Sequence, residues 1–336
     1  MTELASPVKL PVWHTLRAWR RGLTRFNYQL YGLVQAGNAA DYLSDHEVLG
    51  TWRINKDFDG VIRNKLAFCL LMKRFGIPTP EILGMVQKGV FYPLDSWRPM
   101  SPTVFLRELF RPGERLVLKP ISGFHGTGLI ILARTDNGYQ VNGGDTPSHA
   151  LAHTIAKLDH YLVSEFVTQG EYGVKLYPHT VNTIRAMTFW DEETAEPFVA
   201  RVVQRIGTSR SSPVDNFKAG TGGLSASIED ETGKLGPGAM ATVEGRVSWH
   251  PRHPETHAPI KGVVVPSWLE IRKKVLEYAD KFAFAPCIAW DIVPTDSGLS
   301  ILEGNATGGM PVLQVHEPML TDSRIKRFYR YHGVIS

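Results

Sequence analysis

The sequence predicts an α+β fold, on the basis of two strand pairs and two helical segments. Residues 116–133 consist of an apolar strand, a glycine-rich turn and a second apolar strand. Residues 287–305 contain another pair of apolar runs, and residues 61–75 and 267–282 have helical patterns. These segments predict sheets built from hairpins, with helices packed against them.

Residues that end helices or form turns predict the remaining elements along the chain. Residues 1–60 have helical character, and the helix over 61–75 stops at Gly76 and Pro78. Residues 181–206 contain two apolar strands joined by an acidic turn at 191–193. Residues 208–262 are rich in Gly, Ser and Pro and are expected to form loops over a site.

The later helix has its own start signal. Ser267 and Glu270 stand in the spacing of a capping box, in which each side chain bonds the other's backbone N–H. We therefore expect a helix from Ser267 to about Phe282.

Composition is that of a globular protein with a large core. The chain has 336 residues, 43% of them hydrophobic and 21% charged, which is enough for two or three subdomains. Its longest uninterrupted apolar run, Leu66 to Met72, is too short to cross a bilayer, and no apolar signal segment follows the start. The two cysteines, Cys69 and Cys287, lie in apolar segments and are expected to be reduced core residues of a cytoplasmic protein.

The N-terminal region carries an uneven charge. Residues 1–30 contain five basic residues and only one acidic residue. Trp13, Leu16, Trp19 and Leu23 recur at the spacing of one helix face. We expect this face to pack inward and the basic side to be solvated. The alternatives are a membrane-surface helix or a grip on an acidic glycan.

Three polar residues near the C-terminus have the chemistry of a Mg²⁺ site. Side chains alternate along a strand, so Ile301, Glu303 and Asn305 are expected on one face. Asp291 is the acidic residue of the preceding apolar strand. A hairpin would bring these oxygen ligands together, and Mg²⁺ prefers oxygen. The alternative is a strand end with polar residues that turn into a loop.

The earlier hairpin has the composition of a phosphate-binding flap. Lys119 ends its first strand, and Gly123, Gly126 and Gly128 allow the backbone to approach an anion closely. The alternative is an ordinary hairpin with a flexible tip.

Other nucleotide motifs are excluded. The chain has no Gly-x-x-x-x-Gly-Lys-Ser/Thr followed by a helix, and its glycines precede a strand, unlike those of a dinucleotide fold. A protein kinase places its lysine after the glycine loop, whereas Lys119 precedes the loop here.

In this context the chain resembles the ATP-grasp superfamily, over roughly residues 45–310. The motifs occur in that family's order: Asn64-Lys65, Gly76-Ile77-Pro78-Thr79-Pro80, Lys119 with its glycines, the strand 161–167 followed by Glu171, and Asp291 with Glu303-Gly304-Asn305. Residues 181–185, 214–217 and Gly222-Gly223 resemble the sugar-transfer-associated branch, which is related to the alpha-L-glutamate ligases.

The resemblance implies an ATP-grasp fold, with two α+β subdomains clasping ATP and a helical N-terminal region. The implied boundaries are residues 1–79 for the N-terminal region, 80–167 for the lid with its flap, and 168–336 for the metal and substrate part. Loops 140–160 and 208–262 would set the choice of substrate.

The resemblance also assigns residues. Lys119 would hold the α- and β-phosphates with help from Lys65, and Glu171 would either accept from the ribose or be a solvated loop acid. The implied ATP-binding set is Lys65, Lys119, Ser122, Gly123, Gly126, Thr127, Gly128, Glu165, Phe166, Val167 and Glu171. The implied metal ligands are Asp291, Glu303 and Asn305.

Three arginines and a glycine-rich loop complete the expected site. Arg201 and Arg205 lie four apart on one strand and so share a face, and Arg185 on the preceding strand could join them. The alternative is a salt-bridged sheet face. The implied substrate residues are Asn182, Asp215, Asn216, Gly222 and Gly223.

A second metal signal is weaker. The histidines His250, His253 and His257 invite a zinc interpretation, but the prolines among them favour a stiff exposed loop.

The expected function is an ATP-dependent carboxylate–amine ligase that works through an acyl phosphate with ATP and one or two Mg²⁺, Mn²⁺ being a substitute. Its partners would be an amine and a small-molecule or glycan-linked carboxylate, in polysaccharide or peptide-like metabolite synthesis. No nucleic acid is expected, and a homodimer stays open. The alternatives are an ATP-grasp phosphotransferase acting on a hydroxyl and a non-catalytic ATP-binding protein.

Overall fold

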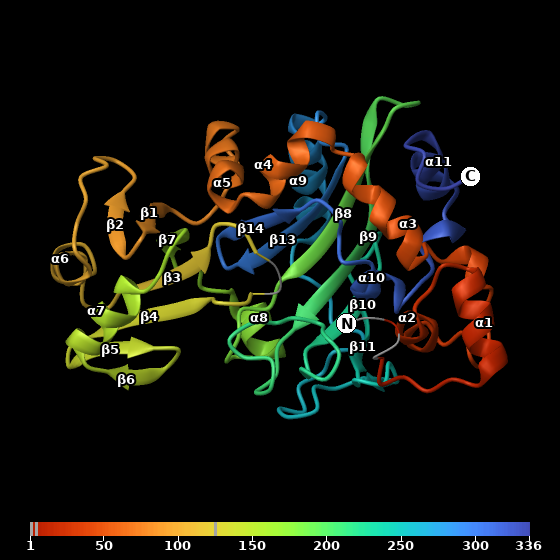
Figure 1. Cartoon of the computed structure of the whole chain (residues 1–336), viewed down its shortest axis with the longest axis horizontal. Coiled ribbons are helices and arrows are strands. Elements are labelled where there is room, and N and C mark those ends of the chain that lie inside the picture. The colour runs from red at the N-terminus through yellow and green to blue at the C-terminus, as the bar shows by residue number, and fades with distance from the viewer. Residues whose placement is uncertain (1–2, 4–5, 124–125) are drawn as a thin grey trace. The chain divides into compact units, whose positions relative to one another are not determined.

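The computed structural model describes residues 3, 6–123 and 126–336 and divides the chain into two compact units. Unit 1 contains the residues up to Ile62 together with Gln169–Ser336, and unit 2 is Arg63–Thr168. Each unit contains a seven-stranded sheet with helices (Figure 1). The strand pairs are antiparallel, so the protein is of the α+β class, as the sequence predicted.

In unit 2 the sheet has the order β2-β1-β7-β3-β4-β5-β6. Its strands are β1 (Ile82–Gln87), β2 (Val90–Pro93), β3 (Arg115–Pro120), β4 (Ile130–Thr135), β5 (Gly138–Val141), β6 (Gly144–Thr146) and β7 (Tyr161–Glu165). Its helices are α5 (Lys65–Arg74), α6 (Pro102–Glu108) and α7 (Ser148–Ala156).

The core of unit 2 explains one departure from the sequence reading. Residues 140–160 were expected to be a loop, but they contain β6 and α7. Leu151 and Ile155 of α7 are fully buried, in one cluster with Leu118 of β3 and Phe105 of α6. Leu151 and Ile155 are therefore core residues, and the segment is not a loop throughout.

The helix predicted over residues 61–75 is confirmed as α5 and the short α4 (Asp59–Arg63) before it. Asn64 caps α5, because its side chain accepts from the Ala67 N–H. The helix ends at Arg74, and Gly76 then adopts a φ of 66°, where a residue with a β-carbon is disfavoured.

In unit 1 the sheet has the order β12-β11-β10-β9-β8-β13-β14. Its strands are β8 (Ile184–Asp191), β9 (Glu196–Ile206), β10 (Leu224–Ile228), β11 (Leu235–Ala241), β12 (Val247–His250), β13 (Cys287–Thr295) and β14 (Gly298–Asn305). Its helices are α1 (Val12–Arg20), α2 (Arg25–Leu30), α3 (Asp45–Gly50), α8 (Glu171–Leu176), α9 (Trp268–Lys281), α10 (Met310–Gln314) and α11 (Ser323–Tyr331). Short 3-10 turns are η2 (Ala39–Asp41), η3 (Thr51–Arg53), η4 (Lys56–Phe58) and η5 (Met319–Thr321).

The expectation of loops over residues 208–262 is wrong in part, because β10, β11 and β12 extend the sheet there. Leu224 of β10 pairs with Ile206 of β9, so backbone pairing overrides the low strand propensity of Gly and Ser. Gly238 lies within β11, where a β-carbon would come 2.9 Å from the Leu224 side chain. Glycine in this segment thus permits close packing within the sheet.

Helices cover both faces of the unit 1 sheet. Ala289 and Trp290 are successive residues of β13 and point to opposite faces. Ala289 packs in one cluster with Met310 of α10 and Phe328 of α11. The Trp290 ring meets the Phe282 ring, which follows α9. One face therefore carries α10 and α11, and the other carries α9.

The capping box predicted for α9 does not form. Ser267 has a φ of 52° and makes no side-chain capping bond. A complete capping box instead links Ser44 and Glu47 at the start of α3. A favourable spacing is therefore not enough, since the residue at the N-cap must also adopt an extended backbone conformation.

The N-terminal helices are part of unit 1 through buried polar contacts. Asn55, which is 1% exposed, donates to the Cys287 carbonyl at 2.7 Å and accepts from its N–H at 3.0 Å. Gln314 likewise accepts from the Leu43 N–H and donates to its carbonyl. These bonds attach the N-terminal segment to β13 and α10.

We predict that Asn55→Ala lowers the free energy of unfolding by about 2–4 kcal/mol, because it leaves the buried N–H and C=O of Cys287 without partners. The measurement is chemical denaturation of the whole protein. Asn38→Ala is the control: Asn38 also bonds two groups, but at an exposed 3-10 turn. Equal destabilisation by the two variants would contradict the anchoring role of Asn55.

Candidate functional site

The glycine-rich turn of unit 2 has the backbone geometry expected of an anion-binding loop. Gly123, Gly126 and Gly128 have φ values of 151°, 64° and 80°, which favour glycine. All three are exposed, as are Ser122 and Thr127. At Gly128 a β-carbon would come 2.6 Å from the Tyr161 hydroxyl. Phe124 and His125, also in the predicted flap, lie outside the described residues.

Both lysines predicted to bind phosphate are located at this turn. Lys119 is on β3, opposite Leu162 of β7. Lys65 is the first residue of α5, and its Nζ donates to the carbonyl of Gly123 at 3.0 Å. The Lys65 N–H donates to the Ile121 carbonyl. Lys65 therefore holds the base of the flap, and its ammonium group already lies at the flap backbone.

The strand end after β7 is fixed by two residues. The Glu165 carboxylate accepts the N–H of Glu81 at 3.0 Å. The Phe166 ring lies under the Arg115 guanidinium at 3.6 Å, and the Phe166 N–H donates to the Arg115 carbonyl. Burial lowers the pKa of Arg115. Because the Phe166 N–H is already bonded, a backbone contact between Phe166 and the adenine base of ATP would have to use the Phe166 carbonyl. Val167 follows and is half-buried.

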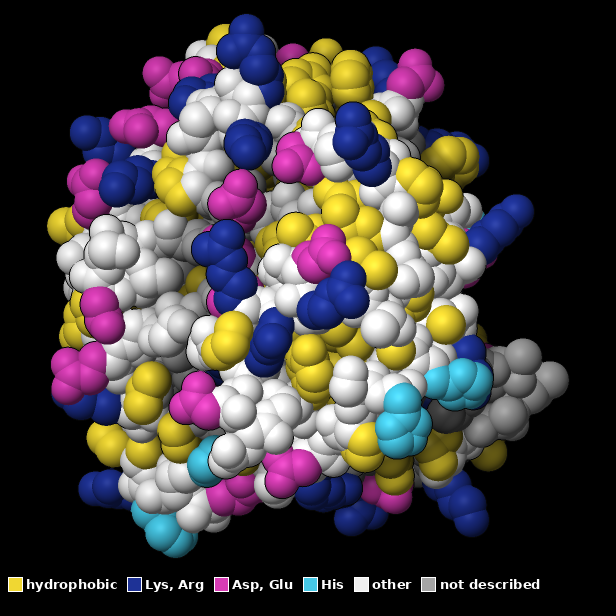
Figure 2. Space-filling model, turned by 90° about the vertical axis from the view of Figure 1, so that its left-hand side faces the viewer, with side chains coloured by type: hydrophobic (Ala, Val, Ile, Leu, Met, Phe, Trp, Pro, Cys, Tyr) yellow, Lys and Arg dark blue, Asp and Glu magenta, His cyan; other side chains and the backbone are white. Residues whose placement is uncertain are grey.

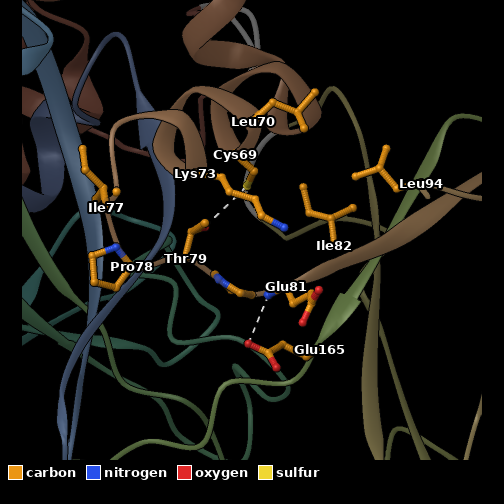
Figure 3. A pocket seen from close by; sticks show the side chains of 12 residues that line it. Cys69, Leu70, Lys73, Ile77, Pro78, Thr79, Glu81, Ile82, Leu94 and Glu165 are labelled. Carbon is orange, nitrogen blue, oxygen red and sulfur yellow. Dashed lines mark hydrogen bonds between the residues drawn. The ribbon is translucent and has the colours of Figure 1, made fainter.

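A cavity of about 450 Å³ lies beside Glu165 in unit 2 (Figure 3). Its walls include the apolar side chains of Leu70, Ile77, Ile82 and Leu94. Lys73 and Glu165 supply charged groups to the lining. Its size and largely apolar walls are typical of a small-molecule pocket.

In unit 1, Asp291 lies in a buried ion network on three neighbouring strands. Arg185 of β8 grips its carboxylate in two-point fashion, Nε to Oδ1 and Nη2 to Oδ2, each at 2.8 Å. Arg205 of β9 donates to Oδ2 at 3.1 Å. Asp291 is 2% exposed and Arg205 7%. The fork geometry explains why arginine rather than lysine fits here.

A second carboxylate holds Arg205 from the other side. Asp215 bonds Arg205 Nη2 at 2.9 Å and accepts the N–H and hydroxyl of Thr183 at 2.7 and 2.6 Å. The Thr183 hydroxyl in turn accepts from Arg205 Nε at 2.9 Å. Arg205 is therefore fixed between two buried carboxylates and one hydroxyl.

The pKa values follow from this network. Burial alone would raise the pKa of Asp291, but the charges of Arg185 and Arg205 and the hydrogen bonds to Asp291 from Arg185 and Glu303 lower it. Burial would lower the pKa of Arg205, but Asp215, Asp291 and Glu303 raise it. Asp291 and Arg205 are therefore charged near neutral pH.

Glu303 and Asn305 lie on the same face as Asp291. Glu303 pairs with Asp291, and Asn305 with Ala289 two residues away. The alternation expected for β14 is broken by a bulge at Leu302, so Ile301 pairs with Ile292 and lies on the opposite face from Glu303. The expectation that Ile301 shares the face of Glu303 is wrong.

These residues fit a divalent cation in part. Three carboxylates, Asp215, Asp291 and Glu303, lie in the same network as the guanidinium groups of Arg185 and Arg205. Asn305 Nδ2 donates to the Ala289 carbonyl, so its oxygen can serve as a ligand. Asp291 fits less well, because both of its oxygens already accept hydrogen bonds, Oδ1 from Arg185 and Oδ2 from Arg185 and Arg205. Among the described residues, no group of three His, Cys, Asp or Glu has metal-site geometry.

Arg201 does not join the other two arginines. It shares a face of β9 with Arg205, but its Nη2 donates to the Pro318 carbonyl at 2.8 Å. It also lies 3.5 Å from Glu317 and 3.9 Å from Asp322. Four residues along a strand span about 13 Å, so a shared face does not imply a shared ligand.

The expected substrate residues have structural contacts. Asn182 is 1% exposed; its amide nitrogen donates to Gln169, Gly173 and Tyr177, and its oxygen accepts from Gly207. The amide group of Asn182 is therefore bonded within the buried interior, and its contact with a substrate stays a prediction.

The glycine-rich loop has a similar structural explanation. A β-carbon on Gly223 would come 2.1 Å from the Asn216 carbonyl, and one on Gly222 would come 2.9 Å from the Thr208 hydroxyl. These glycines are required by close backbone packing.

Two further expectations can be placed. Glu171 is the first residue of α8, 74% exposed in its side chain, and pairs with Lys175 at 2.8 Å. His253 is fully buried and bonds the Gly207 carbonyl, whereas His250 and His257 are not buried. The structure therefore does not bring the three histidines together as one exposed set.

Sequence reasoning missed two residues of this site. Thr183 bridges Arg205 and Asp215, but one threonine beside a strand gives no signal. Gly309 has a φ of 66°, and a β-carbon there would lie 3.0 Å from Nη1 of Arg185. The Gly308-Gly309 pair, which begins three residues after Asn305, was a signal that could have been used.

Comparisons with known proteins agree with this architecture. The model of the sugar-transfer associated ATP-grasp family matches residues 54–328. The chain therefore belongs to this ATP-grasp family. A search of curated proteins found no match.

Several solved structures are similar at low identity. D-alanine–D-alanine ligase from Bacillus anthracis, complexed with ATP, aligns over 82% of this chain and 68% of its own, with 15% identity and a TM-score of 0.43. The Helicobacter pylori D-alanine–D-alanine ligase aligns over 80% and 58%, with 10% identity and a TM-score of 0.43. Carboxyaminoimidazole ribonucleotide synthase from Aspergillus clavatus, complexed with ATP, aligns over 74% and 45%, with 11% identity and a TM-score of 0.39. The chain thus spans between 45% and 68% of the length of these proteins.

We predict that Asp291→Asn destabilises the protein by about 3–5 kcal/mol at pH 7, because it removes the charge that pairs two buried guanidinium groups. The folded-state pKa of Asp291 is below its ordinary value of 3.8. Its stabilisation is therefore present above the unfolded pKa and lost as the pH falls through the lowered folded pKa. The gap between parent and variant should narrow below about pH 4.

The measurement is urea unfolding of both proteins across that pH range. Asp136→Asn is the control, because Asp136 is an exposed turn residue whose replacement should change stability by less than about 0.5 kcal/mol. A gap that stays constant down to pH 2 would contradict the ion-pair assignment.

Proposed function

We propose that this protein is an ATP-dependent carboxylate–amine ligase. A substrate carboxylate oxygen attacks the γ-phosphorus of ATP, and ADP leaves to give an acyl phosphate. An amine then attacks the acyl carbon, loses a proton and expels inorganic phosphate, which leaves an amide. The observation that carries the proposal is the Arg185–Asp291–Arg205 network beside Glu303 on one sheet face, in a chain of the ATP-grasp family.

Unit 2 would bind the nucleotide. The Lys119 ammonium would neutralise the α- and β-phosphates, and the flap backbone at Gly126 and Gly128 would donate N–H groups to them. The strand end at Glu165 borders the cavity, whose apolar walls suit a planar base. These contacts position the triphosphate and exclude water from an acyl phosphate that would otherwise hydrolyse.

Unit 1 would supply the groups for the carboxylate and the metal. Glu303 and Asn305 would hold Mg²⁺, with Asp291 contributing through Oδ1. When bound, Mg²⁺ would neutralise charge on the β- and γ-phosphates.

Arg185 is the residue we assign to the reacting carboxylate. Asp291 fixes Nε and Nη2, so the guanidinium plane is set and the remaining Nη1 edge is directed at Gly309. The missing side chain at Gly309 keeps this edge accessible to an oxygen ligand. Arg205 would act as a positioning residue, because its donors are used to hold Asp291, Asp215 and Thr183.

The substrate class and place of action follow as part of the same proposal. The family's description as sugar-transfer associated favours a glycan-linked carboxylate and a role in polysaccharide synthesis. Cys69 and Cys287 are buried free thiols, which favours a reducing, cytoplasmic compartment. Two alternatives stay open: transfer of phosphate to a hydroxyl, which makes no amide, and non-catalytic binding of ATP.

We predict that Lys119→Met weakens ATP binding about 10- to 150-fold, because it removes a charge-assisted contact worth about 1.5–3 kcal/mol. Isothermal titration calorimetry without an acceptor substrate measures this. The control is Lys157→Met, which removes an exposed ammonium from the same unit. If both variants bound ATP as tightly as the parent, Lys119 would not be part of the ATP-binding site.

We predict that oxygen-18 in the acid substrate moves into inorganic phosphate during turnover, and only when the amide forms. One carboxylate oxygen must leave with phosphate if an acyl phosphate is made. Mass spectrometry of phosphate, in reactions with and without an amine, measures the transfer.

The control for this experiment is Glu303→Gln, which should keep the fold and lose both amide and labelled phosphate. A stable phosphate ester with no amine requirement would replace the ligase by the phosphotransferase. If the protein bound ATP but turned over neither acids nor alcohols, the result would favour the alternative of a non-catalytic ATP-binding protein.

A further inference from the structure

Helix α1 exposes an apolar face that the sequence was expected to bury. Val12 is 76% exposed, Trp13 52%, Leu16 54% and Trp19 48%. At 100° per residue, Val12, Leu16 and Trp19 lie within one sector of the helix, with Trp13 at its border. The expectation that this face packs inward is therefore wrong for Trp13, Leu16 and Trp19, whereas Leu23, after the helix, is buried.

The opposite side of α1 is the one that packs. His14 and Ala18 are buried, at 7% and 0% exposure, and Ala18 belongs to a cluster with Ala239 and Ala241 of β11. The buried side fixes the rotation of the helix. Inward rotation of the exposed side chains would remove His14 and Ala18 from the core.

Neighbouring side chains also hold the exposed aromatic residues. The Trp13 ring stacks on His14 at 3.6 Å and carries the Arg17 guanidinium at 4.5 Å. The Trp19 indole N–H donates to Glu3 at 3.0 Å. The face is thus a preformed surface, so binding would require little ordering of these side chains.

The charge of the chain is concentrated at this helix. Residues 1–30 have five basic residues and one acidic residue, a balance of +4 that equals the net charge of all 336 residues. The remainder of the chain is therefore neutral overall. On the face drawn in Figure 2, which is turned toward the left of Figure 1, basic and acidic side chains are intermingled.

The basic residues differ in availability. Arg21 pairs with Glu47 at 2.9 Å and Arg25 with Glu3 at 3.2 Å. Lys9, Arg17 and Arg20 are exposed. On the helix, Arg20 and Arg17 flank the apolar sector on one side. The combination is an apolar strip with two tryptophans, bordered by cations.

We propose that α1 binds the surface of an anionic lipid bilayer. Val12, Trp13, Leu16 and Trp19 enter the boundary between headgroups and acyl chains, and Lys9, Arg17 and Arg20 contact lipid phosphates. Tryptophan suits this boundary because its ring is apolar and its N–H is polar. Among the residues that the structure describes, none of the helices has the length and apolar character to span a bilayer, so contact is confined to the surface.

Lipid fits this helix better than a protein groove does. The strip is convex and only nine residues long, about 13 Å. Its excess positive charge requires a surface carrying many negative charges, which an anionic bilayer supplies without a specific geometry. In Figure 1, α1 lies at the margin of unit 1, away from β13 and β14.

The test is flotation of the whole protein with phosphatidylcholine vesicles, with and without phosphatidylglycerol. We expect binding to the anionic vesicles only, and weaker binding at higher salt. The double variant Trp13→Ser/Leu16→Ser should lose binding at least tenfold. Arg17→Gln/Arg20→Gln should weaken it about 25-fold, at about fivefold per cation.

The matched control is Trp97→Ser, since Trp97 is also 52% exposed but belongs to unit 2. Trp97→Ser should float with the anionic vesicles as the parent does. The temperature of thermal unfolding should be the same in all variants. Three results would overturn the proposal: no binding of the parent to anionic vesicles, binding that Trp13→Ser/Leu16→Ser leaves intact, or retention on an acidic polysaccharide resin without vesicle binding. A dimer in sedimentation velocity that Trp13→Ser/Leu16→Ser dissociates, without vesicle binding, would assign the face to a second copy of the chain.

Discussion

The position of Arg205 between two buried carboxylates is the interaction on which the candidate site of unit 1 depends. Its guanidinium bonds Asp215 at 2.9 Å and Asp291 at 3.1 Å, and the side chain is 8% exposed. Removing a charge from such a position leaves another charge buried without a partner, which costs far more than a surface ion pair contributes. The pairing also requires β8, β9 and β13 to keep their register, because Asp291, Arg185 and Val203 face one another across them. Sheet register and site geometry are therefore set by the same contacts.

The two units order their proposed ligand groups in different ways. In unit 1, Arg185 and Arg205 are fixed by hydrogen bonds to buried acids, so their positions are set before any ligand binds. In unit 2 the described flap residues are exposed, and its glycines have backbone conformations that side chains rarely adopt. A rigid set of charges suits stabilisation of a developing phosphoryl charge, since no reorganisation is needed at the moment of reaction. An exposed glycine-rich hairpin suits entry and release of a nucleotide.

The sequence predicted those features that depend on local pattern and failed where tertiary contacts decide. Lys119 before its glycine turn, and Asp291 opposite Glu303, follow from strand and hairpin patterns, and the structure contains both arrangements. The bulge at Leu302 could not be predicted from the alternation of side chains along β14. One extra residue in the strand moves all the side chains before it to the opposite face of the sheet. Periodicity places Arg201 on the same face of β9 as Arg205, yet the guanidinium of Arg201 donates hydrogen bonds to the segment after α10. The internal hydrogen bonds of Asn182 could not be predicted either, because contacts between distant segments leave no trace in a single sequence.

The same limit explains α1 and gives its exposed face a consequence for the site. Periodicity showed that Trp13, Leu16 and Trp19 share a side, but the small Ala18 and the polar His14 form the side that fits against β11 and α2. Because Asn55 and Gln314 tie the N-terminal segment to β13 and α10, α1 belongs to the unit that carries Arg185 and Asp291. A bilayer bound at α1 would therefore be held at a fixed orientation to this sheet.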